Sequence, residues 1–192
     1  MNMKELMKKA FHLGGTLFAV TAVTGLILGV VQHYTSIAIK RVEMEAQNAA
    51  FRIVLPDGKN FEEFEVKPDE FVAEVKKADD GSKLVGWCMN VNSKGYGGIV
   101  NFIVGITKDG GVKAINILSH SETPGLGAKS TEPEFYGQFA DKKATPLKVV
   151  KGSASNPDEI VAISGATITS NAVTSGVNAA VEYWAKNLKG VE

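Results

Sequence analysis

Residues 83–118 read KLVGWCMNVNSKGYGGIVNFIVGITKDGGVKAINIL, and this stretch decides the fold. Its runs at 83–91, 99–107 and 112–118 are rich in β-branched and aromatic residues, a composition typical of strands. The segments NSKGYGG and KDGG between the runs are glycine-rich turns. Turns this short join antiparallel neighbours, so the stretch predicts a three-stranded meander.

The flanking segments predict further strands and helices around this meander. The acidic segment 61–81 is expected to form one strand and a short helical turn, and 147–152 another strand. Residues 131–141 predict a short helix with Thr131 as its N-cap. A terminal helix carries an apolar stripe of Val173, Val177, Ala180, Val181, Trp184 and Leu188. The expected fold class is α+β, an antiparallel sheet covered by helices.

The N-terminal region predicts a membrane anchor. From Ala10 to Ile39 there is no Asp, Glu, Lys or Arg, and a helix of roughly 20 apolar residues crosses a hydrocarbon core of about 30 Å. A cleavable signal peptide is the alternative, because a basic leader precedes the run, but its apolar part is usually only about 7–15 residues. We therefore expect a basic leader at 1–9 and a retained transmembrane helix at 10–35.

Basic residues predict the orientation of this helix. Lys4, Lys8 and Lys9 precede it, and Lys40 and Arg41 follow at a greater distance. Because basic residues concentrate on the cytoplasmic side, we expect a cytoplasmic N-terminus and an extracytoplasmic domain at 36–192. Apolar and small residues continue at helical spacing to Ile53, so the helix is expected to extend into this domain until Pro56-Asp57-Gly58 ends it.

Composition excludes several classes of function. Lys plus Arg number 21 and Asp plus Glu also 21, so no net positive charge favours nucleic acid. The one cysteine, Cys88, cannot close an intramolecular disulfide or build a metal cluster, and we expect it to pack in the core. No GxGxxG follows a strand and opens a helix, so direct NAD binding is not expected. Redox chemistry in this chain would need an organic cofactor.

The segment SGATITS, residues 164–170, stands directly before the terminal helix. A helix N-terminus presents unpaired N–H groups and a partial positive charge, which favour a phosphate. Gly165 lets the backbone approach closely, and the neighbouring side chains are small or hydroxylated. The alternative is that Thr169 or Ser170 merely caps the helix and that Ser164-Gly165 is a turn.

Three ordered motifs behind the anchor carry a resemblance: GYGG at 95–98, SETPGLG at 121–127 and SGAT at 164–167. Together they resemble the extracytoplasmic FMN-binding domain found in the G subunit of Rnf electron-transport complexes and in the C subunit of sodium-pumping NADH:quinone oxidoreductases. The short chain favours the Rnf G subunit. One departure is Val161, since the family often has Asp three residues before the Ser of SGAT.

The resemblance implies covalent FMN, attached by a flavin transferase through a phosphoester to Thr167, with Thr169 as the second candidate acceptor. Ser164, Gly165 and Ala166 would line the attachment site. In SETPGLG, Leu126 would lie against the flavin ring, Glu122 and Thr123 would hydrogen-bond to ring or ribityl oxygens, and Gly127 would shape the loop. Tyr96 would stack near the cofactor, although GYGG also suits an ordinary hairpin turn.

The function implied by this resemblance is electron transfer within a larger enzyme. The chain would relay electrons in an Rnf-type complex that couples ferredoxin:NAD electron transfer to ion translocation, and it would not be catalytic alone. Its expected partners are the other membrane subunits, the flavin transferase and membrane lipid. The alternatives are the C subunit of the quinone oxidoreductase and a cofactor-free anchored scaffold in which SGATITS only begins a helix.

Overall fold

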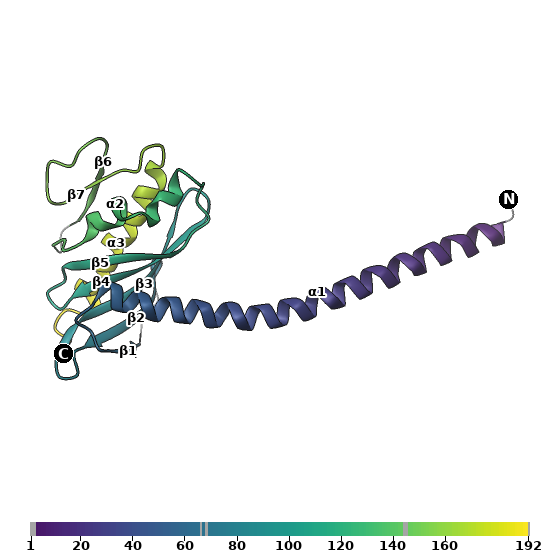
Figure 1. Cartoon of the computed structure of the whole chain (residues 1–192), viewed down its shortest axis with the longest axis horizontal. Helices are drawn as coiled ribbons and strands as arrows, with labels where there is room; N and C mark the ends of the chain where they lie inside the picture. The colour runs from purple at the N-terminus through teal and green to yellow at the C-terminus, as the bar shows by residue number, and fades with distance from the viewer. Residues whose placement is uncertain (1–2, 66, 68, 144–145, 192) are drawn as a thin grey trace. The chain divides into compact units, whose positions relative to one another are not determined.

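A computed structural model describes residues 3–65, 67, 69–143 and 146–191 (Figure 1). The chain forms two compact units, Met1–Glu45 and Ala46–Glu192. The helix α1, Met3–Val54, includes a stretch at His12–Ser36 with a mean hydropathy of 2.0, long and apolar enough to cross a membrane. The long N-terminal helix is therefore confirmed, and the boundaries 10–35 stay a prediction.

The second unit is built on a five-stranded sheet in the order β1-β2-β3-β4-β5, with every pair antiparallel. Its strands are β1 Asn60–Phe64, β2 Val72–Asp79, β3 Leu84–Lys94, β4 Ile99–Thr107 and β5 Val112–Ser119. The predicted meander corresponds to β3, β4 and β5 and is confirmed, as is the α+β class.

The acidic segment before the meander departs from the expectation. It forms two paired strands, β1 and β2, where one strand and a helical turn were predicted. The ring of Phe64 on β1 packs edge-on against Trp87 on β3, with 5.0 Å between ring centroids. The strand is thus stabilised by a distant aromatic residue, which the acidic local sequence does not reveal.

The two faces of the sheet are covered by different helices. Side chains alternate along a strand, so Trp87 and Met89 on β3 face the core beneath α3, Thr167–Asn187, while Cys88 faces the last turns of α1. The apolar stripe of the terminal helix is buried at Val173, Val177, Ala180, Trp184 and Leu188, and Val181 packs against that core.

Small residues let both helices approach the sheet closely. A Cβ atom on Gly105 of β4 would lie 2.5 Å from the Val54 carbonyl oxygen at the end of α1. A Cβ atom on Gly176 of α3 would lie 2.7 Å from Phe102 Cζ on the opposite face. The core therefore holds α3 at a close, defined distance from the strands that precede the candidate site.

The segment between β5 and α3 is less regular than predicted. In place of the expected helix at 131–141, the chain forms a short α2, Pro133–Tyr136, and a 3₁₀ turn Gly137–Phe139 (η2). Another 3₁₀ turn, Gly127–Thr131 (η1), precedes them. Thr131 is not the N-cap, because Glu132 holds that position and the Thr131 hydroxyl donates to the Ala128 carbonyl at 2.9 Å.

A second, two-stranded sheet leads into the terminal helix. The predicted strand appears as β6, Lys148–Val150, and pairs in parallel with an unpredicted strand β7, Glu159–Val161. Three residues in β7 are too few for a strand pattern to stand out in the sequence. Pairing with β6 orders the chain just before residues 164–170.

Candidate functional site

The GYGG motif forms the tight turn between β3 and β4. The Gly95 N–H donates to the Gly98 carbonyl at 2.8 Å, which leaves Tyr96 and Gly97 at the tip. Gly98 has a φ of +154°, a conformation that a side chain disfavours. Tyr96 is 72% exposed, so its ring stands in solvent beside the turn.

Glu122 lies in the loop after β5 and links the GYGG and SETPGLG motifs to the start of α3. Its side chain is buried, with 6% of the residue exposed. One carboxylate oxygen, Oε1, accepts the Gly97 N–H of the first motif at 2.9 Å. The other, Oε2, accepts the Thr169 hydroxyl at the start of α3 at 2.5 Å. The carboxylate therefore joins the hairpin tip, its own loop and the first turn of α3.

Glycines make room for this buried carboxylate. A Cβ atom on Gly95 would collide with Glu122 Oε1, and one on Gly97 would collide with the Ser121 carbonyl oxygen. A Cβ atom on Gly127 would lie 2.5 Å from Glu122 Oε2 and 2.6 Å from Thr169 Oγ1. The glycines at these positions are required by close packing around Glu122.

The helix α3 begins at Thr167, directly after Gly165 with its φ of +75° and Ala166 at the N-cap position. The first main-chain hydrogen bond of the helix runs from Ser170 N–H to the Ala166 carbonyl at 3.1 Å. The N–H groups of residues 167–169 donate no hydrogen bond to any of the described residues. The helix thus presents three free donors at its positive end.

Neither Thr169 nor Ser170 caps these N–H groups. Thr169 donates its hydroxyl to Glu122, and Ser170 Oγ accepts the Ile163 N–H at 2.9 Å while donating to the Ala166 carbonyl at 3.0 Å. The simple capping interpretation of SGATITS is therefore wrong for both residues. Ser170 instead holds the turn that precedes the helix from inside the domain.

Exposure separates the two candidate threonines. Thr169 is 1% exposed, whereas Thr167 is half-buried and its neighbours Ser164 and Gly165 are exposed. Two apolar side chains near this segment, Ile168 at 55% and Leu126 at 43%, are also exposed. Leu126 contacts the Gly165 backbone, since its Cδ2 would lie 3.0 Å from a Cβ at that glycine.

Two grooves lie near the start of α3. One, of about 490 Å³, includes Ile99 of β4 and Ile168, Asn171 and Ser175 on one face of α3. The other, of about 400 Å³, includes Ser164, Ala162, Lys129 and Gln138. Ser164 therefore borders one groove and Ile168 the other, on either side of Thr167 in the sequence.

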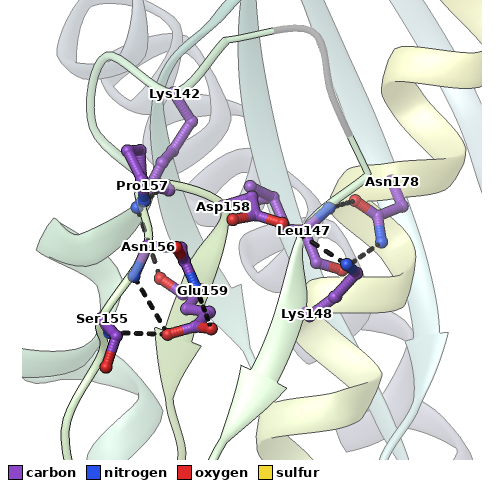
Figure 2. A network of polar contacts seen from close by, with 9 residues as sticks. All are labelled: Lys142, Leu147, Lys148, Ser155, Asn156, Pro157, Asp158, Glu159 and Asn178. Atoms are coloured by element: carbon purple, nitrogen blue, oxygen red, sulfur yellow. Dashed lines mark hydrogen bonds and ion pairs between the residues drawn. The ribbon is translucent and has the colours of Figure 1, made fainter.

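A polar network steadies the chain before this segment (Figure 2). The Glu159 carboxylate accepts the Ser155 N–H at 2.6 Å, the Asn156 N–H at 3.1 Å and the Asn156 amide at 2.7 Å. The Asn156 side chain first, and then the two backbone donors, hold the pKa of Glu159 below its ordinary value. The amide of Asn178 on α3 bonds the Leu147 backbone in both directions, at 2.8 and 2.9 Å.

Thr123, another predicted site residue, contributes through its backbone. The carbonyl of Thr123 accepts the N–H groups of Leu126 and Ala128 at 3.2 Å each, which closes the PGLG turn, while its side chain is exposed. Two residues that contact Glu122 were not among the predicted site residues. The side chain of His120 accepts the Glu122 N–H through Nδ1 at 3.2 Å, and the Gly97 N–H donates to the Glu122 carboxylate. Both contacts involve a backbone N–H, which every residue except proline carries, so no residue type in the sequence marks them.

Known proteins match this arrangement over most of the chain. The FMN-binding domain family matches residues 95–182, a range that contains all three motifs. The G subunit of the proton-translocating ferredoxin:NAD⁺ oxidoreductase complex of Clostridium ljungdahlii is 41% identical over 160 residues, covering 83% of each chain. The chain belongs to the family of G subunits of ion-translocating oxidoreductase complexes.

Two further relatives extend the comparison. The G subunit of the Na⁺-translocating ferredoxin:NAD⁺ oxidoreductase complex of Acetobacterium woodii is 34% identical over 194 residues, covering 92% of each chain. The crystal structure of the C subunit of the Na⁺-translocating NADH-quinone reductase from Parabacteroides distasonis superposes with a TM-score of 0.61 at 18% identity, covering 80% of this chain and 97% of that one. At that identity the likeness concerns the fold alone, which it supports.

Proposed function

We propose that this protein is a membrane-anchored flavoprotein that carries FMN covalently on Thr167 and relays electrons in an Rnf-type complex. Such a complex couples ferredoxin:NAD electron transfer to ion translocation. The relatives, which are named for this reaction, support the complex, and the FMN-binding domain supports the cofactor. The observation that carries the attachment site is the half-buried threonine at an uncapped helix start.

The residues present fit a phosphoester of FMN. Gly165, with its φ of +75°, leaves the backbone accessible in front of the helix, and the three free N–H groups of 167–169 offer donors to a negatively charged phosphate. Among the described residues, no carboxylate makes a hydrogen bond to these N–H groups. When bound, FMN supplies one- or two-electron redox chemistry that the side chains of this chain lack.

Thr167 suits the role of acceptor better than Thr169. The hydroxyl of Thr169 is buried and already donates to Glu122, so modifying it would leave a buried carboxylate oxygen without its donor. Thr167 is half-buried and lies beside exposed Ser164 and Gly165. A transferase that brings the flavin from solution can reach Thr167 without opening the core.

Orientation completes the proposal. The apolar helix fits a single-pass anchor in a membrane complex. We place the N-terminus in the cytoplasm and the domain outside it, because more basic residues precede the apolar stretch than follow it closely. On that side the domain meets a flavin transferase during maturation and the other membrane subunits afterwards.

Covalent attachment is tested in protein purified from its native host. Denaturing gel electrophoresis followed by flavin fluorescence is expected to give a bright band for the wild type and a dark band for Thr167→Ala. Thr131→Ala, which removes the hydroxyl of an exposed threonine outside this segment, serves as the control and keeps the signal. Mass analysis of the peptide that spans 164–170 is expected to show the added FMN on the wild type.

Different outcomes select the alternatives. A dark wild-type band from the native host supports the cofactor-free scaffold. Loss of fluorescence in Thr169→Ala with retention in Thr167→Ala moves the acceptor to Thr169. Co-purification with the components of a sodium-pumping NADH:quinone oxidoreductase, instead of Rnf-type components, identifies the chain as the C subunit of that enzyme.

A further inference from the structure

We infer that Glu122 is a positioning residue for flavin attachment, which acts by holding Thr169 inside the domain so that Thr167 faces outward. This inference rests on the proposed attachment of FMN to Thr167. It differs from the role that the family resemblance suggests for Glu122, which is a hydrogen bond to the flavin itself.

The contacts of Glu122 favour a role within the protein. Both carboxylate oxygens accept protein donors, the Gly97 N–H at 2.9 Å and the Thr169 hydroxyl at 2.5 Å. With 6% of the residue exposed, the protein leaves a ligand little access to the carboxylate. Charge-assisted hydrogen bonds of this kind are stronger than neutral ones, so the two protein contacts hold the side chain firmly in place.

Helix geometry connects Thr169 to Thr167. Successive residues turn by about 100° around an α-helix, so the directions of residues two apart differ by about 160° and are nearly opposite. An anchor that holds Thr169 inward therefore directs Thr167 outward. The burial pattern agrees, because Thr169 is 1% exposed while Thr167 is half-buried and is followed by exposed Ile168.

The start of α3 needs such an anchor. The N-cap residue Ala166 makes no side-chain hydrogen bond to the helix, so the first turn lacks the usual fixing contact. Ser170 binds the incoming chain at Ile163 and Ala166, and the Glu122–Thr169 pair binds the loop after β5. Without that pair, no side-chain hydrogen bond among the described residues would tie the first turn to the other two motifs.

Kinetics of flavin attachment test this inference. The full chain would be produced without a flavin transferase, purified in detergent and mixed with FAD, Mg²⁺ and purified transferase, and the rate would be followed by in-gel fluorescence. The variants are Glu122→Ala, Glu122→Gln, Thr169→Val, Thr169→Ser and the double variant Glu122→Ala/Thr169→Val. The matched control is Ser93→Ala, which removes a buried hydroxyl that donates to the Ala172 carbonyl at 2.7 Å on the same helix.

If the Glu122–Thr169 hydrogen bond positions Thr167, the attachment rates of the variants should follow a specific pattern. Thr169→Val and Glu122→Ala should each slow attachment on the order of tenfold, since each loses a buried hydrogen bond to a charged group. Thr169→Ser keeps the hydroxyl, and Glu122→Gln can still accept the Gly97 N–H and contact Thr169, so both should stay within about threefold of the wild type. Ser93→Ala should match the wild type.

The double variant separates positioning from direct contact. If Glu122 acts through Thr169, the double variant is no slower than the slower single variant, because both changes remove one shared interaction. Losses that multiply would overturn the inference in favour of a separate contact between Glu122 and the flavin. A wild-type rate for Thr169→Val, or a Glu122→Gln rate as low as that of Glu122→Ala, would also overturn it.

Two further measurements test the folding of the variants and the proposed attachment of FMN to Thr167. Thermal unfolding of every variant shows whether a slow rate reflects an unfolded substrate, and the two conservative variants decide the inference if the alanine variant does not fold. A wild type that never becomes fluorescent with active transferase would refute attachment itself. A fluorescent wild type with unaffected Thr169→Val would refute only the positioning role.

Discussion

Replacing Gly127 with alanine tests the packing on which the site depends. Gly127 is not one of the glycines with a positive φ, so alanine meets no backbone strain at this position. Its Cβ would lie 2.5 Å from Glu122 Oε2 and 2.6 Å from Thr169 Oγ1, whereas ordinary contacts begin at 3.4 Å. The two side chains would have to move apart from the new methyl group by about 0.9 Å at the closer contact.

The expected cost follows from this overlap. Overpacking a well-packed interior by a methyl group costs about 1–3 kcal/mol. For a domain of this size, each kcal/mol lowers the unfolding midpoint by about 2–4 °C. The matched control is Gly137→Ala, because Gly137 has helical backbone angles and no atom within 4 Å of the added Cβ. That variant should gain about 0.4–1 kcal/mol through a less flexible unfolded chain.

Thermal unfolding of the full chain in detergent, followed by tryptophan fluorescence, measures both variants, since Trp87 and Trp184 are buried in the domain. Gly127→Ala should unfold at a lower temperature than the wild type, and Gly137→Ala at the same or a higher one. A Gly127→Ala protein as stable as the wild type would refute the close packing of Gly127 against the Glu122–Thr169 pair.

Two further predictions concern other parts of the domain. Cys88 is fully buried and burial raises the pKa of its thiol, so iodoacetamide at about pH 8 should label it only after denaturation, as measured by mass; native labelling at the denatured rate would contradict the core assignment. The depressed pKa of Glu159 means that its bonds to Ser155 and Asn156 persist above the ordinary carboxyl pKa of 4.5 and are lost as pH falls through the lower folded value. Hydrogen exchange at these two amides should therefore gain an acid-dependent opening, absent in Glu159→Gln; an opening unchanged by that substitution would assign it to another group.

Local pattern was sufficient for the parts of the fold that depend on neighbours in the chain. Runs of β-branched and aromatic residues between glycine-rich turns predicted β3, β4 and β5, and the stripe from Val173 to Leu188 predicted α3. These signals are strong because each face of a strand or helix repeats within a few residues. The apolar stretch of α1 was equally plain, since it needs only length and composition.

Local sequence patterns were therefore enough to predict the meander and the long helices, and the three motifs suggested that their residues meet. The contacts through which they meet depend on the folded chain. Glu122 and Thr169 are 47 residues apart, and Glu122 and Gly97 are 25 apart, so no local pattern records their hydrogen bonds. Strand β1 likewise packs Phe64 against Trp87 of β3, and β7 forms only with its partner β6, so neither strand is evident from its own short segment. Contacts between remote segments require the chain to be closed into its fold before they exist, which is the physical reason that they escape sequence reasoning.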